Sequence, residues 1–246
     1  MSKVQTFFYL NIGVSGLEGR AHGLSPVKLC IKPVSRDALL ARSVNLDRRD
    51  IEMFDFDEID DQYEAGKSLI NYDLNFDAPV ARRLLAYIDA FPKPAVLVSY
   101  SGCIQNYPII RSALARHGLT LPDTVQICDL LQAIRVIEGD FKNSYKFPDV
   151  YERVTKKIYK VNGMEGKILP HIKMMVECSD ALLDKWIEWV DVGRNRLSLD
   201  TVRLPQELRK KNNTNKSSRV IKKFRNADSK QPTILKYFKI KKELKQ

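Results

Sequence analysis

The stretch that decides the fold is residues 4–17, VQTFFYLNIGVSGL. It holds a β-branched and aromatic run, Phe7 to Ile12, which favours a strand buried in a sheet. Gly13 and Gly16 interrupt that run, and glycine is typical of turns because it tolerates conformations that other residues avoid. The sequence therefore predicts a buried strand close to the N-terminus that ends abruptly in a turn.

Short apolar strands and amphipathic helices alternate after this stretch. Asp77 is a plausible N-cap for a helix over 78–91, and Gly118 is expected to end a helix over 107–117. This alternation predicts an α/β fold with a mixed or parallel central sheet flanked by helices. The other expected elements are strands at 27–31, 95–100 and 125–128, an acidic loop over 44–64, helices over 129–137 and from about 147 to 159, and a last helix capped by Ser179.

The region from Leu97 onward, LVSYSGCIQNYPIIRSALARHGLTLPDTVQICDLLQAI, carries a recognisable motif pattern. With the first strand, it resembles the DEDD-type 3′-to-5′ exonuclease family, and within it the three-prime repair (TREX-like) branch. The resemblance covers roughly residues 3–192 and implies an RNase H-like fold. The positions that fit the second motif are Gly102, Pro108, Leu114, Gly118, Leu119 and Asp129.

The resemblance also identifies the positions where that family carries metal-binding acids. The Asp-x-Glu of its first motif falls on Asn11 and Gly13, and the Asp of its second motif falls on Asn106. The third motif, His and an Asp five residues later, is placed at Gly166 and His171. These four acidic positions are therefore degenerate: Asn11, Gly13, Asn106 and His171.

The lost carboxylates bear on catalysis. Two-metal phosphodiester hydrolysis needs carboxylates that hold the ions and neutralise their charge. Amide and glycine positions do not supply that charge, so we expect a pseudo-exonuclease that is not an enzyme and has no metal and no cofactor. The alternative is an active exonuclease whose ligands have moved to other positions.

The charge of the chain is concentrated at its C-terminal end. The whole chain has 41 basic and 30 acidic residues; from residue 203 onward there are 15 basic and 3 acidic residues, so the tail carries +12 and residues 1–202 carry −1. We expect a folded domain over 1–200 and a disordered basic tail over 201–246. Its two basic clusters resemble a bipartite nuclear-import signal and predict a nuclear protein; they comprise Lys210, Lys211, Lys222, Lys223 and Arg225.

A short motif lies within that tail. Gln231, Ile234, Tyr237 and Phe238 match the box Gln-x-x-(Ile/Leu/Met)-x-x-aromatic-aromatic, which binds the sliding clamp proliferating cell nuclear antigen (PCNA). In one helical turn the last three would project together as an apolar plug. The alternative is a short amphipathic helix that packs on the chain's own domain.

Together these features predict an adaptor that binds PCNA at nuclear DNA, in replication, repair or chromatin silencing. The alternative is a protein that binds single-stranded DNA or RNA in the former substrate groove, with added affinity from the basic tail. Further protein partners of the folded domain are expected, and the sequence does not decide whether the protein forms a homodimer. The four cysteines are scattered and no apolar run reaches bilayer length, so the sequence predicts an intracellular protein without disulfides or a membrane segment.

Overall fold

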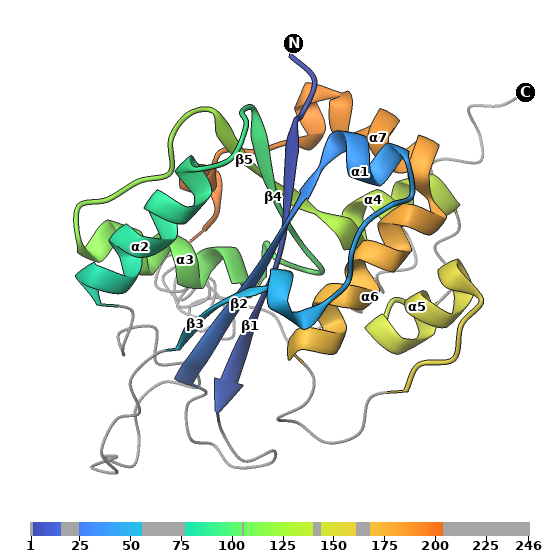
Figure 1. Cartoon of the computed structure of the whole chain (residues 1–246), viewed down its shortest axis with the longest axis horizontal. Coiled ribbons are helices and arrows are strands. Elements are labelled where there is room, and N and C mark those ends of the chain that lie inside the picture. The colour runs from blue at the N-terminus through green and yellow to red at the C-terminus, as the bar shows by residue number, and fades with distance from the viewer. Residues whose placement is uncertain are drawn as a thin grey trace, which may run out of the picture. The chain divides into compact units, whose positions relative to one another are not determined.

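The computed structural model has a mixed five-stranded sheet with helices on both faces (Figure 1). The sheet order is β3-β2-β1-β4-β5, which places β1 in the centre. The fold predicted from the sequence, an α/β domain with a mixed central sheet, is therefore confirmed. The structure describes residues 2–15, 25–55, 77–104, 106–139, 144–160 and 168–203.

The strands pair in two directions. β1 pairs antiparallel with β2, and β2 pairs antiparallel with β3. On its other side β1 runs parallel to β4, and β4 runs parallel to β5. The carboxyl ends of the three parallel strands therefore lie at the same edge of the sheet. The strand bounds are β1 Thr6–Ser15, β2 Ser25–Ser35, β3 Glu52–Asp55, β4 Ala95–Ser99 and β5 Val125–Asp129.

The helices form two layers. The helices α2 and α3 pack on one face of the sheet, and α1 and α4 to α7 pack on the other. The helix bounds are α1 Arg36–Leu40, α2 Ala78–Asp89, α3 Asn106–Arg116, α4 Leu130–Glu138, α5 Phe147–Thr155, α6 Ile168–Ala181 and α7 Leu183–Asp191. Among the residues that the structure describes, no helix is long and apolar enough to cross a bilayer.

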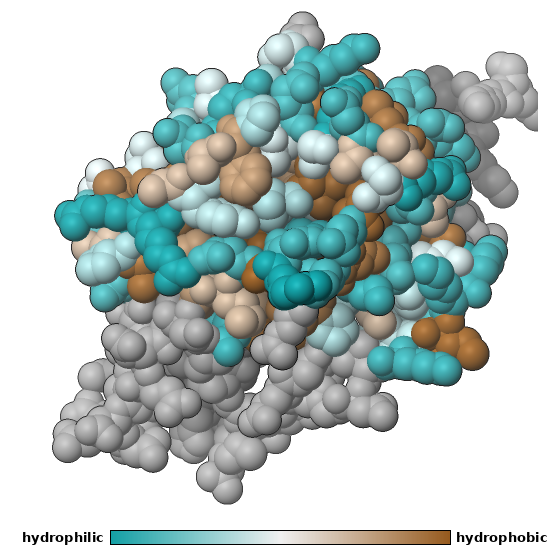
Figure 2. All heavy atoms as spheres, in the orientation of Figure 1, coloured by the Kyte–Doolittle hydropathy of each residue, from teal (hydrophilic) through white to brown (hydrophobic). Residues whose placement is uncertain are grey.

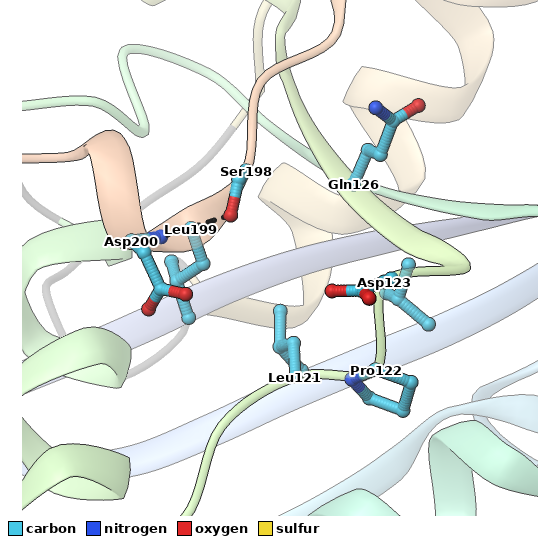
Figure 3. Close-up of a pocket in the computed structure, with 8 residues that line it drawn as sticks. Leu121, Pro122, Asp123, Gln126, Ser198, Leu199 and Asp200 are labelled. Carbon is cyan, nitrogen blue, oxygen red and sulfur yellow. Dashed lines mark hydrogen bonds between the residues drawn. The ribbon is translucent and has the colours of Figure 1, made fainter.

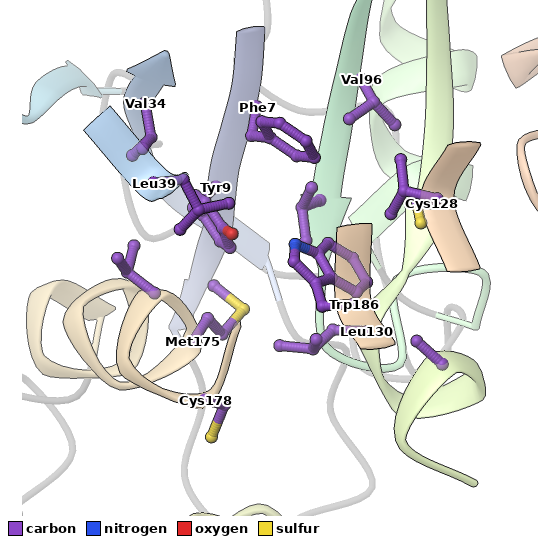
Figure 4. Packing of buried hydrophobic residues seen from close by; sticks show 14 of the residues in the cluster. Phe7, Tyr9, Val34, Leu39, Val96, Cys128, Leu130, Met175, Cys178 and Trp186 are labelled. Atoms are coloured by element: carbon purple, nitrogen blue, oxygen red, sulfur yellow. The ribbon is translucent and has the colours of Figure 1, made fainter. Parts of the chain in front are cut away.

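β1 contributes side chains to the apolar cores on both faces of the sheet, because successive side chains of a strand point to opposite faces. Phe7 and Tyr9 are buried against α6 and α7, where Trp186 lies close to Phe7 (Figure 4). Phe8 and Leu10 are buried on the opposite face against α2 and α3. Figure 2 shows that polar side chains cover much of one outer face of the domain. The apolar run that marked this strand in the sequence thus supplies the centre of both cores.

Local predictions had mixed outcomes. The Asp77 carboxylate accepts from the backbone N–H of Val80 at 2.8 Å, which confirms the predicted cap of α2. The expected loop over 44–64 is wrong in part, because Glu52–Asp55 pairs with β2 as β3. Ser179 does not cap a helix: it lies inside α6, where its Oγ donates to the Met175 carbonyl at 3.1 Å. A buried serine inside a helix can satisfy its hydroxyl in this way without ending the helix.

Candidate functional site

The candidate site lies where β1 and β4 end and α3 begins. β4 pairs with β1 only as far as Tyr9 opposite Val98, so Asn11 and Gly13 extend past the paired part of the sheet. Because side chains alternate, Asn11 and Gly13 continue the face of β1 that Phe7 and Tyr9 begin. Ligands of α/β proteins commonly bind outside the carboxyl ends of parallel strands, and this is such a place.

Asn11 and Asn106 come together across 95 positions of sequence. The Asn106 Nδ2 donates to the Ser99 Oγ at 2.6 Å and to the Asn11 Oδ1 at 3.4 Å. Asn106 is 3% exposed and Ser99 is fully buried, whereas Asn11 is half-buried. Among the residues that the structure describes, the buried Asn106 Oδ1 has no hydrogen-bond partner. Such an oxygen loses the hydration it would have in water, at a cost of about 1 to 3 kcal/mol, unless a donor reaches it.

Gly13 faces the first turn of α6. A Cβ at this position would lie 2.1 Å from the Ile168 Cδ1 and 2.9 Å from its Cγ1, far inside van der Waals contact. The Ile168 side chain therefore occupies the space that any larger residue at position 13 would need. The wall of the site next to the asparagine pair is apolar as a result.

Asp129 fixes the loop that leads from β4 to α3. Its carboxylate accepts from the backbone N–H groups of Ser101 at 3.0 Å, Cys103 at 3.2 Å and Leu131 at 3.0 Å. Burial raises the pKa of this carboxyl above its ordinary value, although these backbone donors act in the opposite direction. Burial, together with the nearby Asp129, also raises the pKa of the Cys103 thiol to about 11. Asp129 therefore acts on the site through the backbone that it holds.

Tyr107 anchors the start of α3. Its hydroxyl lies 2.9 Å from the Leu97 carbonyl and 2.6 Å from the Cys128 carbonyl, which places it between β4 and β5. Gly102 packs against this ring, since a Cβ there would lie 2.6 Å from the Tyr107 Cε2. The residue before this tyrosine is Asn106, so the anchored ring holds the asparagine at the strand ends.

His171, the position assigned to the third motif, contacts α5 and the segment after it. His171 lies in the first turn of α6, where its Nε2 is 2.8 Å from the Tyr159 hydroxyl and its ring contacts Phe147 edge-on. Burial raises the pKa of Tyr159. These contacts tie α6 to α5 and the segment after it. Gly166, the other position assigned to that motif, lies outside the described residues.

The contacts give the site a neutral hydrogen-bonding character. The predicted positions that it brings together are Asn11 and Asn106, while Gly13 contributes space that Ile168 fills. Within the described ranges, no group of three or more His, Cys, Asp and Glu residues is arranged to hold a metal ion. The residues predicted for nuclear import and PCNA binding, from Lys210 to Phe238, lie outside those ranges.

The sequence did not indicate two residues that contribute to the candidate site. Ser99 is the buried partner of Asn106, and the signal for it was a hydroxyl at the last residue of a buried strand. Ile168 fills the space at Gly13, and nothing in its local sequence indicates that contact.

A pocket lies at the start of β5, away from these residues (Figure 3). It has a volume of about 60 Å³, and both apolar side chains and exposed carboxylates line it. The Ser198 Oγ accepts from the backbone N–H of Asp200 at 3.3 Å on one side. The lining residues are Leu121, Pro122, Asp123, Val125, Gln126, Ser198, Leu199 and Asp200.

Comparison with solved structures identifies the fold. The E. coli ExoI–ssDNA complex in its zinc-bound form matches with a TM-score of 0.52 and 12% identity, covering 78% of this chain and 44% of that protein. The nuclease domain of 3′hExo, a DEDDh family member bound to rAMP, matches with 0.52 and 10%, covering 76% and 96%. A 3′-exonuclease that recognises the histone mRNA stem-loop matches with 0.51 and 11%, covering 76% and 66%. No family model and no curated protein matches the sequence.

These matches show an exonuclease-like, RNase H-like fold, as the motif spacing had predicted. They overturn the prediction that the chain is not an enzyme: the solved structures that share the fold are exonucleases, so that exclusion is wrong. It was drawn from motif positions alone, whereas a two-metal site is made by whichever carboxylates the tertiary structure brings to the strand ends. At 10–12% identity, the similarity to these structures shows the fold alone.

Proposed function

We propose that this protein binds nucleic acid through its exonuclease-like domain and is recruited to PCNA by its C-terminal box, at nuclear DNA undergoing replication, repair or chromatin silencing. The observation that carries recruitment is the match of Gln231, Ile234, Tyr237 and Phe238 to all four defining positions of the clamp-binding box. An apolar plug of three side chains suits a hydrophobic pocket, and the flanking lysines suit an acidic partner surface.

Calorimetry with purified PCNA tests this recruitment. Replacing Tyr237 and Phe238 with Ala should weaken binding at least about a hundredfold, because each buried aromatic anchor contributes about 2 kcal/mol or more. Leu235→Ala is the matched control, since it removes an apolar side chain at a position that the box does not specify. Unchanged affinity of the double variant would refute recruitment through the box.

Nucleic-acid binding by the folded domain is the second part of the proposal. Support comes from the site at the ends of β1 and β4, where Asn106 begins an eleven-residue helix. The N-terminus of such a helix carries a partial positive charge, which favours phosphate groups. Neutral side chains at Asn11 and Asn106 add no charge that would repel a phosphate. Two of the similar solved structures hold, by their descriptions, ssDNA or rAMP.

Deleting the basic tail distinguishes its contribution to nucleic-acid binding from that of the folded domain. Phosphate contacts by lysine and arginine make affinity fall steeply with salt. Removing residues 203–246 takes away 15 basic residues, so the salt dependence of binding to a labelled single strand should flatten. Residual affinity in residues 1–202, measured by fluorescence anisotropy at low salt, is the expected result. A shortened chain that folds and binds nothing would confine nucleic-acid binding to the tail.

The same two clusters, Lys210–Lys211 and Lys222–Arg225, account for the nuclear location in this proposal. Replacing Lys222 and Lys223 with Ala in a fluorescent fusion should move the protein out of the nucleus. Replacing Lys241 and Lys242 is the control, since these lysines lie outside the two clusters. Nuclear accumulation unaffected by the first change would contradict the import assignment.

A further inference from the structure

We infer that residues 156–160, KKIYK, form a second contact surface for single-stranded nucleic acid, outside the candidate site. This inference rests on the proposed nucleic-acid binding and names a surface that takes part in it. The segment follows α5 and combines three exposed lysines with Ile158, whose exposed fraction is 71%. A single strand matches this combination, because its phosphates attract lysines and its bases offer apolar faces.

Hydrogen bonds fix the backbone of this segment on both sides of its isoleucine. The Lys157 N–H donates to the Thr155 Oγ1 at 3.2 Å, and the Tyr159 N–H donates to the Glu152 Oε1 at 2.9 Å. Both acceptors belong to α5. A single exposed apolar side chain is common on protein surfaces, but Ile158 lies between lysines on a backbone that the helix holds in place.

The three lysines differ in what they contact. The Lys157 Nζ pairs with the Glu177 carboxylate at 2.9 Å, and the same carboxylate accepts from the Tyr151 hydroxyl at 2.7 Å. Within the described ranges, no ion pair involves Lys156 or Lys160. These two exposed ammonium groups are therefore the ones that we expect to contact phosphates, and each such contact makes affinity more dependent on salt.

Tyr159 places the segment beside the candidate site. Its hydroxyl lies 2.8 Å from the Nε2 of His171 in α6. One turn earlier in the same helix, Ile168 fills the space at Gly13. Residues three positions apart lie on the same face of a helix, so α6 joins the segment to the site. We therefore expect one bound strand to contact both.

Salt dependence tests the two lysines. Binding of the full chain to a labelled oligo(dT) is measured by fluorescence anisotropy at several salt concentrations. Replacing Lys156 and Lys160 with Ala should reduce the slope of log affinity against log salt by about 1.4, since each phosphate contact on a single strand contributes about 0.7. The control variant, Arg82→Ala with Lys185→Ala, removes equal charge from exposed positions in α2 and α7 and should leave the slope unchanged. A slope that changes no more in the first variant than in the control overturns the lysine contacts.

A strand without bases tests the isoleucine. Ile158→Ser should bind oligo(dT) about three- to fivefold more weakly than the wild type, the range for partial burial of one aliphatic side chain. An abasic strand of the same length keeps the phosphates, so it should bind both proteins equally. Val136→Ser is the control, because this β-branched side chain in α4 is 65% exposed. Equal binding of oligo(dT) by Ile158→Ser and the wild type overturns the base contact.

The outcomes separate this inference from the proposed function. Thermal unfolding should show that every variant is folded, since each replaced side chain is exposed. Oligonucleotide binding that survives in all variants, while binding to phosphatidylserine vesicles is lost, overturns the inference and assigns the segment to an anionic lipid surface. Failure of the wild type to bind any strand contradicts the proposed nucleic-acid binding itself.

Discussion

One face of one strand holds two different regions. At its amino end, Phe7 and Tyr9 are fully buried and pack against α6 and α7. At its carboxyl end, Asn11 and Gly13 lie beyond the paired part of β4 and meet Asn106 and Ile168. The first pair contributes burial of apolar surface, and the second contributes hydrogen-bonding groups and space. The same face of β1 therefore serves the core at Phe7 and Tyr9 and the candidate site at Asn11 and Gly13. The change falls where the pairing with β4 ends.

The largest expected effect comes from breaking the packed end. Phe7→Ala removes a fully buried ring whose centroid lies 6.3 Å from that of Trp186, and it leaves a cavity. The free energy of unfolding should fall by about 3 to 5 kcal/mol, as measured by denaturant titration. Phe7→Leu, which keeps most of the apolar volume, should lose much less. A loss below about 1 kcal/mol for the alanine variant would contradict the assignment of this end to the core.

Gly13→Ala tests the space at the other end. The added Cβ would overlap Ile168, so unfolding should become easier by about 1 to 3 kcal/mol. In an Ile168→Ala background the same change should cost much less, because the overlapping atoms are gone. A double-mutant cycle on the four proteins measures this coupling. Equal costs in both backgrounds would show that the two residues do not compete for space.

Arg36 sharpens the comparison by binding the amino end of β1 to α7. Its guanidinium donates to the Asp191 carboxylate at 3.0 and 2.7 Å and to the Val4 carbonyl at 3.3 Å. Removing one partner of this largely buried pair, in Arg36→Ala, should cost about 1 to 2 kcal/mol at neutral pH, discounted for the 26% exposure of Asp191. Arg49→Ala is the control, since the Arg49 side chain is 88% exposed and its pair with Asp47 should contribute little.

The same pair gives a pH dependence with a defined sign. Burial alone would raise the pKa of Asp191, but the hydrogen bonds and charge of Arg36 lower it below the ordinary value. A carboxyl with a lowered pKa in the folded state contributes stability above its unfolded pKa of about 3.9, and loses it as pH falls through the folded value. The difference between wild type and Arg36→Ala should therefore shrink below about pH 4. A constant difference down to the acid transition would contradict this linkage.

The smallest effect is expected for Asn11→Ala. This side chain is half-buried and its contact with Asn106 is long, at 3.4 Å, so the free energy of unfolding should change by less than about 0.5 kcal/mol. Its nucleic-acid affinity should fall more than its stability. Anisotropy and thermal unfolding of the same preparation measure both. A large stability loss without loss of affinity would assign Asn11 to the packed region.

The sequence by itself determined the fold class, the strands other than β3 and most helices, because these follow from local patterns. The run from Phe7 to Ile12 and the Asp77 cap each act within a few residues. It also placed Asn11, Gly13 and Asn106 in one site, through the family spacing of their motifs.

Only the tertiary structure decided what those residues contact. The Asn106 amide contacts Asn11, which is 95 positions away in sequence. Ile168, at the start of α6, is also distant in sequence from Gly13, yet its side chain packs against that position. Long-range packing also decides the clash that Ile168 imposes on position 13 and the place of Ser179 within α6. It likewise leaves the Asn106 Oδ1 without a partner among the described residues. Such contacts leave no local pattern, since a side chain's partners are set by how layers pack and not by its neighbours in sequence.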